Sequence, residues 1–339
     1  MNAEVHESTP PDAARPRADA LRPRWWHPMA SGALRAVTWL FGALPAPAAY
    51  LLADLFAVPI ALGWSLSDRR GARVRGYWRN VRIVYRPGGL GPERPRGHLW
   101  RVARHLTWLA VDSCRLHRIR ADTVDRVIDM REFAAMHALY AEGNGIIWAT
   151  AHVGVWDVAG YVCALVGVPI TSVFRPSPIP GVDRVIERLR TGSGQVVVAK
   201  QNVVGTLRRA LARKETIGLL CDSAGRRGDA FPPFLGTPAA TVATPALLQL
   251  SSGAPIVVVT TQRTGRFRFV MRIWDVIRPA AEPGADRDAE VRRILTRINA
   301  GLGRAVAEYP EQWFWQGRRF KHRPPGERPG ADGLPPVAG

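Results

Sequence analysis

A histidine and an aspartate, His152 and Asp157, are separated by four residues and follow an apolar run that ends near Thr150. A carboxylate that accepts the Nδ1 proton of an imidazole leaves Nε2 free to act as a general base. Residues five positions apart on a continuous helix lie about 140° from each other, so the two side chains meet only if the chain turns, as Gly154 permits. The spacing therefore predicts either a general base oriented by Asp157 or an ordinary hydrogen bond in a strand-to-helix turn.

The sequence offers no obvious enzyme nucleophile beside this pair. It contains no G-x-S-x-G motif, and Ser193 lacks the glycine spacing of one. Cys114, Cys163 and Cys221 are far apart and lack C-x-x-C spacing, so we expect buried thiols in a reducing compartment, with no metal ion and no redox pair. A base without an enzyme nucleophile suits a reaction in which the substrate supplies the attacking hydroxyl or amine.

Short β-rich runs alternate with helical segments from about residue 125 onward. This alternation predicts βαβ units and hence an α/β fold, an αβα sandwich whose central sheet is mostly parallel. Because active sites of such sheets gather at the C-terminal ends of the strands, His152 stands where a site is expected. The predicted strands are 145–150, 169–174, 195–199, 216–221, 255–261 and one or two within 266–277; the predicted helices are 158–166, 182–189, 203–213 and 245–250.

The N-terminal region combines a polar tail with a long apolar stretch. Residues 1–27 and 323–339 are rich in Pro and lack periodicity, and we expect both to be disordered tails. Between residues 36 and 64 the only charge is Asp54, so this stretch is long enough to cross a bilayer core of about 30 Å, although prolines interrupt it. It predicts an irregular span, a re-entrant hairpin or helices in the membrane interface. Two core helices of a soluble protein are the alternative, and a signal peptide is not expected.

A basic amphipathic helix is predicted next. Four arginines recur at i, i+4, i+7 and i+11, each preceded by an apolar residue; the two sets are Arg75, Arg79, Arg82, Arg86 and Val74, Trp78, Val81, Tyr85. A helix of this kind is typical of one that lies on an anionic leaflet, although a solvated helix has the same composition. We interpret residues 28–90 as a membrane anchor with this basic helix. The net charge of +19 also favours an anionic partner, whether a membrane surface, an acidic protein or nucleic acid.

Four segments resemble, in order, the motifs of the bacterial lipid A biosynthesis acyltransferase family, and residues 51–54 followed by 73–79 are similar to its membrane-proximal start. This family of late lauroyl and myristoyl transferases is related to the phosphatidylinositol mannoside acyltransferases and to the H-x-x-x-x-D glycerolipid acyltransferases. The lipid A enzymes usually carry H-x-x-N-W-E, whereas this sequence has Val155 for the asparagine and Asp157 for the glutamate and keeps Trp156. The last two segments are the most specific. The four are 149–160 (ATAHVGVWDVAG), 174–194 (FRPSPIPGVDRVIERLRTGSG), 218–241 (GLLCDSAGRRGDAFPPFLGTPAAT) and 309–324 (YPEQWFWQGRRFKHRP).

The resemblance implies a membrane-associated O-acyltransferase with a glycerolipid acyltransferase-like domain at residues 91–322. Such an enzyme would move a fatty acyl chain from acyl carrier protein or acyl-CoA to a hydroxyl of a glycolipid, lipid A-like or phosphatidylinositol mannoside-like. It would act at the cytoplasmic face of the bacterial inner membrane, without metal or other cofactor. Besides His152 and Asp157, the resemblance implies that Arg175 binds an anionic headgroup or positions the acceptor and that Asp222 contacts the acceptor or closes the site. Further candidates for substrate binding are Trp156, Arg188 and Arg190.

Two other functions are compatible with parts of the sequence. With water as acceptor, the same histidine and aspartate would make a thioesterase or lipid hydrolase. The aromatic and cationic residues near the C-terminus would anchor a membrane protein, but they could also stack on single-stranded nucleic acid. No nucleic-acid-binding motif is recognisable, and this function leaves the apolar stretch 36–64 and His152 unexplained, so we expect no nucleic acid partner. These C-terminal residues are Gln312, Trp313, Trp315, Arg318, Arg319 and Lys321.

Overall fold

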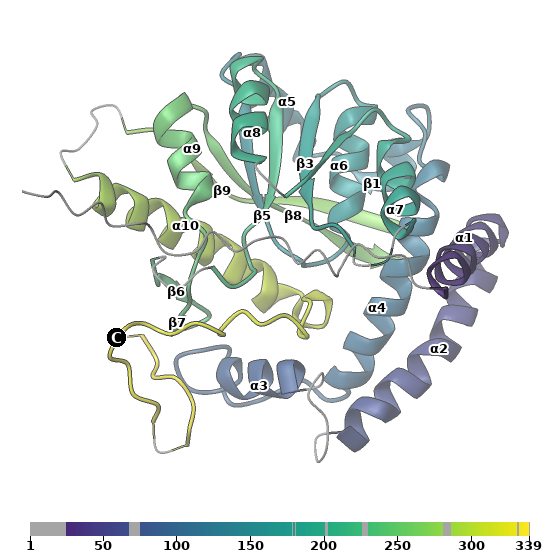
Figure 1. The fold of residues 1–339 in the computed structure, drawn as a ribbon, viewed down its shortest axis with the longest axis horizontal. Helices are drawn as coiled ribbons and strands as arrows, with labels where there is room; N and C mark the ends of the chain where they lie inside the picture. Colours follow the sequence, from purple (N-terminus) through teal and green to yellow (C-terminus); the bar gives the residue numbers. More distant parts are fainter. Residues whose placement is uncertain are drawn as a thin grey trace, which may run out of the picture.

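The computed structural model describes residues 25–67, 75–177, 179, 181–200, 203–225, 230–280, 286–330 and 332–338. A seven-stranded sheet in the order β1-β9-β8-β2-β5-β3-β4 forms its centre, and β6 and β7 form a separate small ribbon (Figure 1). The strands are β1 (Ile128–Asp129), β2 (Ile146–Thr150), β3 (Ile170–Phe174), β4 (Val196–Ala199), β5 (Thr216–Leu220), β6 (Pro233–Phe234), β7 (Thr237–Pro238), β8 (Ile256–Gly265) and β9 (Arg268–Ile277).

The central sheet is mostly parallel, as the sequence predicts. Within it only β8 and β9 pair antiparallel, and each of the other neighbouring pairs is parallel. β2 is buried from Ile146 to Ala149, the continuous burial that a central strand covered on both faces requires. The predicted run 266–277 forms one strand, β9, which joins β8 in a hairpin.

Helices cover both faces of this sheet. They are α4 (His98–Cys114), α5 (Phe133–Ala141), α6 (Trp156–Leu165), α7 (Val182–Thr191), α8 (Val203–Ala212), α9 (Thr244–Ser252) and α10 (Arg287–Glu308). One apolar core joins Ile147 of β2 to α8, α9 and α10, and a second joins Trp148 of the same strand to α5 and α6. Since successive strand residues point to opposite faces, the two cores lie on opposite sides of the sheet. The predicted α/β fold with helices on both faces is confirmed.

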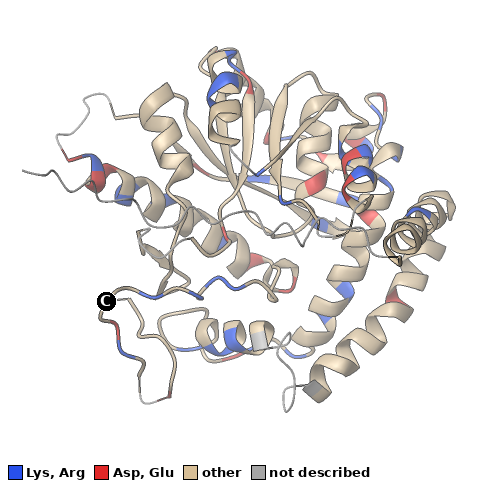
Figure 2. Cartoon of the chain, viewed as in Figure 1, with Lys and Arg blue, Asp and Glu red and all other residues tan. Residues whose placement is uncertain are grey.

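Two apolar helices precede this domain, α1 (His27–Ala43) and α2 (Ala46–Ser67). Small residues of α2 face α4, with Ala49, Ala53 and Ala57 fully or almost fully buried, and Asp54 forms an ion pair with Arg104 of α4 at 2.7 Å. Both helices carry almost no charged side chains (Figure 2). Among the described residues, α2 is the one helix that is long and apolar enough to cross a membrane.

The predicted basic helix exists as α3 (Arg75–Val84), but its apolar side is packed inside the protein. Tyr77, Val81 and Val84 belong to the core cluster of the first sheet face, and the ring of Tyr85 stacks on Trp315 with centroids 5.6 Å apart. In the described part of the predicted apolar stripe, Val81 is buried and Trp78 and Tyr85 are partly buried against other segments of the protein, which corrects the expectation that this stripe faces a membrane; Val74 lies outside the described residues. The sequence pattern could not distinguish a lipid surface from an apolar segment 235 residues away.

The C-terminal tail also differs from the prediction of disorder. Its backbone returns to the domain, where the Ala338 N–H donates to Gly236 O at 2.8 Å and Arg86 donates to Pro335 O at 2.6 Å. Arg323 pairs with Glu327 at 2.6 Å. These contacts hold the described part of residues 323–339 against the β6-β7 ribbon, so its Pro-rich composition reflects an extended segment that is tied down. The other predicted tail falls mainly on residues 1–24, which lie outside the described residues.

Candidate active site

The C-terminal ends of β2 and β5 bring His152 and Asp222 together. The two strands are neighbours and Thr150 lies opposite Leu220, so the residues two positions beyond each strand end face each other. The Nδ1 atom of His152 lies 2.8 Å from Oδ1 of Asp222, and the backbone N–H of His152 donates to Oδ2 at 3.0 Å. The indole N–H of Trp313 donates to the same Oδ2 at 3.0 Å. This buried carboxylate therefore fixes the orientation of the imidazole ring.

The predicted pairing of His152 with Asp157 needs correction. Asp157 lies in the first turn of α6, and its carboxylate forms an ion pair with Arg190 of α7 at 2.9 Å. The Nδ1 position that we assigned to Asp157 is taken by Asp222, which we expected to contact the acceptor or close the site. The physical reason is the sheet register, which places Asp222 next to the ring while α6 turns Asp157 toward α7.

The electrostatics of this arrangement raise the pKa of His152 above its ordinary value. Burial of the ring alone lowers the pKa, but the charge and hydrogen bond of Asp222 outweigh it, and the charge of Asp157 adds to them. Burial raises the pKa of Asp222, yet the nearby His152 and the N–H donors bring it below the ordinary value of a carboxyl. The imidazolium form of His152 is thus stabilised by two carboxylates.

The loop between β2 and α6 is held by backbone contacts on two sides. Gly154 has a φ of +66°, and a Cβ atom there would lie 2.0 Å from the carbonyl oxygen of Thr261 in β8, so no other residue fits. The N–H of Val155 donates to that oxygen at 2.7 Å. On the other side, Phe314 N–H donates to His152 O at 2.8 Å. These bonds set the position of His152 independently of its side chain.

A buried polar network lies behind this loop and was not predicted. Arg263 of β8 donates through Nε to Asp112 of α4 at 2.7 Å and through Nη1 to Nδ1 of His105 at 2.8 Å. The hydroxyl of Tyr50 in α2 donates to the same Asp112 carboxylate, and the His105 ring also hydrogen-bonds the backbone of Gly154. The network therefore connects α2 to the loop that carries His152. Its members are scattered over more than 200 residues, and no spacing in the sequence marks them.

The remaining predicted residues are spread around this edge of the sheet. The ring of Trp156 meets that of His152 edge to face, with centroids 5.0 Å apart. Arg175 is exposed and directly follows β3, at the same end of the sheet as His152. Arg188 and Arg190 face different cavities, because positions two apart on a helix point to nearly opposite sides. Arg190 is bound to Asp157, whereas Arg188 lines a cavity between α7 and α1.

A small cavity of about 50 Å³ adjoins the Asp157–Arg190 ion pair. It lies between α6 and the strands β2, β3 and β5. The pair and Gln195 provide charged and polar lining, and apolar side chains line most of the rest, among them Trp148, Ile170, Val173 and Leu220. The site thus combines a held imidazole with an apolar recess.

The predicted C-terminal set is divided by burial: both tryptophans, Gln312 and Arg319 are buried, so the two rings do not face a membrane, whereas Arg318 and Lys321 are exposed. Trp313 and Trp315 have almost no exposed surface. Arg319 donates to Ala240 O, to the Thr241 hydroxyl and to Asn299 Oδ1, and burial lowers its pKa to about 10. Of these residues, Trp313 donates its indole N–H to Asp222, and the charge of Asp222 acts on Arg319.

No group of three or more His, Cys, Asp or Glu side chains that could hold a metal ion occurs within the described residues.

The protein-family model of bacterial lipid A biosynthesis acyltransferases matches residues 103–322. This segment contains His152, Asp157, Asp222 and the buried C-terminal tryptophans.

Two relatives of known function are similar to the chain. They are the lipid A biosynthesis palmitoleoyltransferase of Escherichia coli (strain K12) and the lipid A biosynthesis acyltransferase of Shigella flexneri, each 27% identical over 188 residues. The aligned part is 55% of this chain and 59% of each relative, so the chain spans less than two thirds of their length.

Proposed function

Since the chain belongs to the bacterial lipid A biosynthesis acyltransferase family, we propose that it transfers a fatty acyl chain to a hydroxyl of a lipid A-like glycolipid. The donor is an acyl thioester, carried by acyl carrier protein or coenzyme A. The observation that carries this proposal is the His152 ring, whose Nδ1 is held by the buried Asp222 at the C-terminal edge of the sheet.

In the proposed reaction the Nε2 atom of His152 accepts the proton of the acceptor hydroxyl while the oxygen attacks the thioester carbonyl. The tetrahedral intermediate then expels the thiolate as the C–S bond breaks, and the imidazolium returns its proton to the sulfur. An ester and a free thiol result, with no acyl-enzyme intermediate. Asp222 and Asp157 stabilise the imidazolium during the step, in agreement with the raised pKa of His152.

The other site residues have proposed roles in binding. Trp156 packs against the ring of His152 and limits its movement. The exposed guanidinium of Arg175 positions an anionic part of the acceptor, because planar arginine forms paired hydrogen bonds with phosphate. The apolar recess beside Asp157 and Arg190 receives the part of the acyl chain next to the thioester.

We also propose that the protein docks on the cytoplasmic face of the inner membrane through α1 and α2. Large apolar side chains on these helices are exposed, with Trp39 73%, Leu55 62% and Phe56 54% accessible. Contiguous exposed apolar surface of this kind marks an interaction with a membrane or a protein. The three free, buried cysteines fit a reducing compartment, where acyl thioester donors are made.

A hydrolase is the second candidate, because the side chain of His152 is 26% exposed and water can reach it. Water would then replace the acceptor hydroxyl and a free fatty acid would be released. The relative amounts of fatty acid and acylated lipid distinguish the two functions.

The test is an acyl-transfer assay with the full chain, an acyl thioester and an under-acylated lipid A precursor, followed by mass spectrometry of the lipids. We expect the acceptor to gain the mass of one acyl chain. The variant His152→Ala should lose at least about 10²-fold in rate, since general base catalysis contributes this much or more. A matched control, His137→Ala, removes an exposed histidine of α5 and should leave the rate unchanged. Equal rates for both variants would contradict the assignment of His152, and release of fatty acid without acylated product would favour the hydrolase.

Membrane docking is tested by flotation with phosphatidylcholine vesicles. A charge at an exposed apolar contact site is costly to bury in the membrane interface, so Leu55→Glu should float markedly less than the wild type. Val204→Glu places the same charge on α8, at a residue that is 49% exposed and lies outside α1 and α2, and should float like the wild type. The same loss for both variants, or for neither, would contradict docking through α2.

A further inference from the structure

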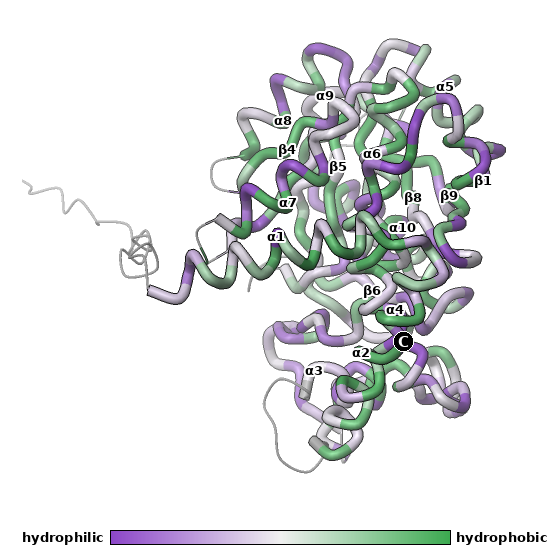
Figure 3. Tube along the Cα trace, turned by 90° about the vertical axis from the view of Figure 1, so that its right-hand side faces the viewer, coloured by the Kyte–Doolittle hydropathy of each residue, from purple (hydrophilic) through white to green (hydrophobic). Residues whose placement is uncertain are grey.

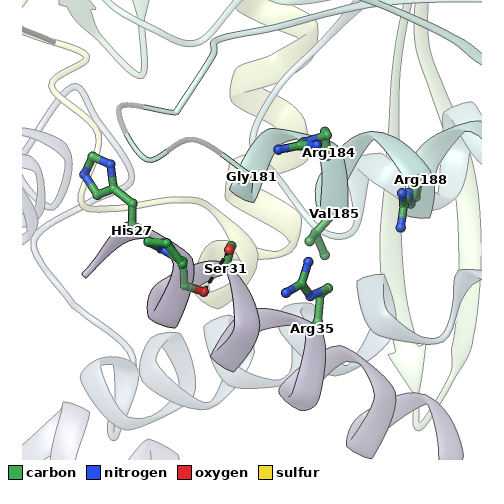
Figure 4. Close-up of a pocket in the computed structure, with 8 residues that line it drawn as sticks. His27, Ser31, Arg35, Gly181, Arg184, Val185 and Arg188 are labelled. Atoms are coloured by element: carbon green, nitrogen blue, oxygen red, sulfur yellow. Dashed lines mark hydrogen bonds between the residues drawn. The ribbon is translucent and has the colours of Figure 1, made fainter. Parts of the chain in front are cut away.

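A second cavity, of about 320 Å³, lies between α1 and α7, outside the active site (Figure 4). Figure 3 shows α1 running along the outside of the domain beside α7. The cavity is lined by Arg35, Arg184, Arg188, Val185 and Gly181, together with His27, Pro28 and Ser31. Most of its polar lining is therefore cationic.

Three guanidinium groups share this cavity without a carboxylate. Arg184 and Arg188 are four residues apart on α7, so they occupy the same side of the helix, and Arg35 rises toward them from α1 (Figure 4). No Asp or Glu is among the described residues that line the cavity, and within the described part of the chain none of the three arginines forms an ion pair. The three side chains are exposed to solvent, so they tolerate their mutual repulsion, and together they give the cavity a positive potential that favours an anionic ligand.

At one end of the cavity, the backbone just before α7 lies in close contact with α1. Gly181 precedes α7 with a φ of +91°, and a Cβ atom there would lie 3.0 Å from the Cβ of Ser31 in α1. Val185, one turn into α7, is buried under this contact. The first two turns of α7 therefore pack closely against α1, and this contact closes one end of the cavity.

We propose that this cavity binds the phosphate group of a membrane lipid. The proposal rests on the membrane docking of α1 given above. Trp39 is one helical turn beyond Arg35 and is 73% exposed, and Met29 and Val37 of the same helix are also exposed. An exposed tryptophan beside an arginine is the arrangement found at the headgroup level of a bilayer. Phosphate suits the site because two or more guanidinium groups can each donate paired hydrogen bonds to its oxygens.

Occupation of this cavity has a direct connection to the active site. α7 carries Arg184 and Arg188 on the side that faces α1, and it carries Arg190, which holds Asp157, on the other side. A lipid phosphate that joins α7 to α1 therefore restrains the helix whose arginine orients Asp157 next to His152.

The proposal is tested by the flotation of the full chain with two kinds of vesicle, phosphatidylcholine alone and phosphatidylcholine with a minority of phosphatidic acid. We expect the wild type to prefer the phosphatidic acid vesicles. The double variant Arg184→Gln/Arg188→Gln should bind these vesicles about thirtyfold less, since each cation near an anionic surface contributes about one factor of five. The control Arg126→Gln/Arg208→Gln removes two exposed arginines that lie outside the cavity and should bind like the wild type. Circular dichroism shows whether each variant is folded.

Equal losses in the two double variants would overturn the proposal, because net charge alone would then explain binding. A second arm measures thermal unfolding with inorganic phosphate and without vesicles. If phosphate raises the unfolding temperature of the wild type but not of Arg184→Gln/Arg188→Gln, and vesicle preference is absent, the ligand is a soluble phosphate and the lipid assignment is overturned. A chain that prefers phosphatidic acid through these arginines but transfers no acyl group would disprove the proposed function and leave the phosphate site standing.

Discussion

Asp222→Asn should lower kcat/KM for acyl transfer by about 10³ to 10⁴-fold, the range expected when a general-base histidine is held in the wrong tautomer. In the protein, Oδ2 of Asp222 accepts two N–H groups, from the backbone of His152 and from the indole of Trp313. An asparagine that keeps its oxygen at this position places its NH₂ group against Nδ1 of His152. Nδ1 must then be an acceptor, so the ring proton moves to Nε2 and the base is lost.

The opposite orientation of the asparagine amide does not restore a stable arrangement of hydrogen bonds. It places the NH₂ group against the N–H of His152 and the indole N–H of Trp313, so three donors face each other without an acceptor. The substitution keeps the size of the side chain, and the loss of activity is therefore expected without loss of the fold. Circular dichroism and thermal unfolding are the checks on folding.

The pH dependence of kcat/KM gives an independent measurement of the same pair. His152 must be neutral to act as a base, and its pKa is raised, so the acidic limb of the wild-type profile should lie above pH 6.5. Removal of the Asp222 charge should move the limb of the residual activity to lower pH. Asp157→Asn should also move the limb downward but cost less activity, because it leaves the Nδ1 hydrogen bond in place. A larger loss in Asp157→Asn than in Asp222→Asn would restore Asp157 as the orienting carboxylate.

Asp112→Ala should destabilise the folded protein by about 3–5 kcal/mol, the cost of leaving a buried charge without its partner. Asp112 is fully buried, and it accepts hydrogen bonds from Arg263 and Tyr50. After the substitution the guanidinium of Arg263 stays inside the protein beside His105, which cannot neutralise it. Urea unfolding in detergent, followed by tryptophan fluorescence, measures the change in the free energy of unfolding.

Two variants control this measurement. Asp275→Ala removes an ion pair with Arg297 in which both side chains are partly exposed, and it should cost no more than about 1 kcal/mol. The double variant Asp112→Leu/Arg263→Met replaces the buried charges by apolar side chains of similar size and should regain most of the stability. Losses of the same size in Asp112→Ala and Asp275→Ala would contradict a special role of the buried network.

Much of the fold follows from local patterns in the sequence. Short runs such as Ile146–Thr150, alternating with amphipathic helices, predict the strands, their parallel pairing and the position of His152 at a strand end. These properties depend on hydrophobic periodicity and on residues close in sequence, which is why they could be predicted.

The partner of His152 depends on strand order instead. Asp222 follows β5, the fifth strand in chain order, and nothing local shows that β5 lies beside β2 rather than beside β4. Asp157 is closer in sequence, and the spacing favoured it, but the first turn of α6 directs its carboxylate to Arg190. A pairing between residues 70 positions apart is determined by the register of the assembled sheet.

The same distinction applies to the N-terminal helices α2 and α3. The sequence by itself determined that the α2 region is apolar along its length, from its composition, and that α3 has one apolar face, from its periodicity. Only the tertiary structure decided that Trp315 covers the apolar face of α3 while Leu55 and Phe56 of α2 remain exposed. Hydrophobic burial has no preferred direction and no preferred partner, so a pattern predicts that a face must be covered, and the packing of distant segments decides what covers it.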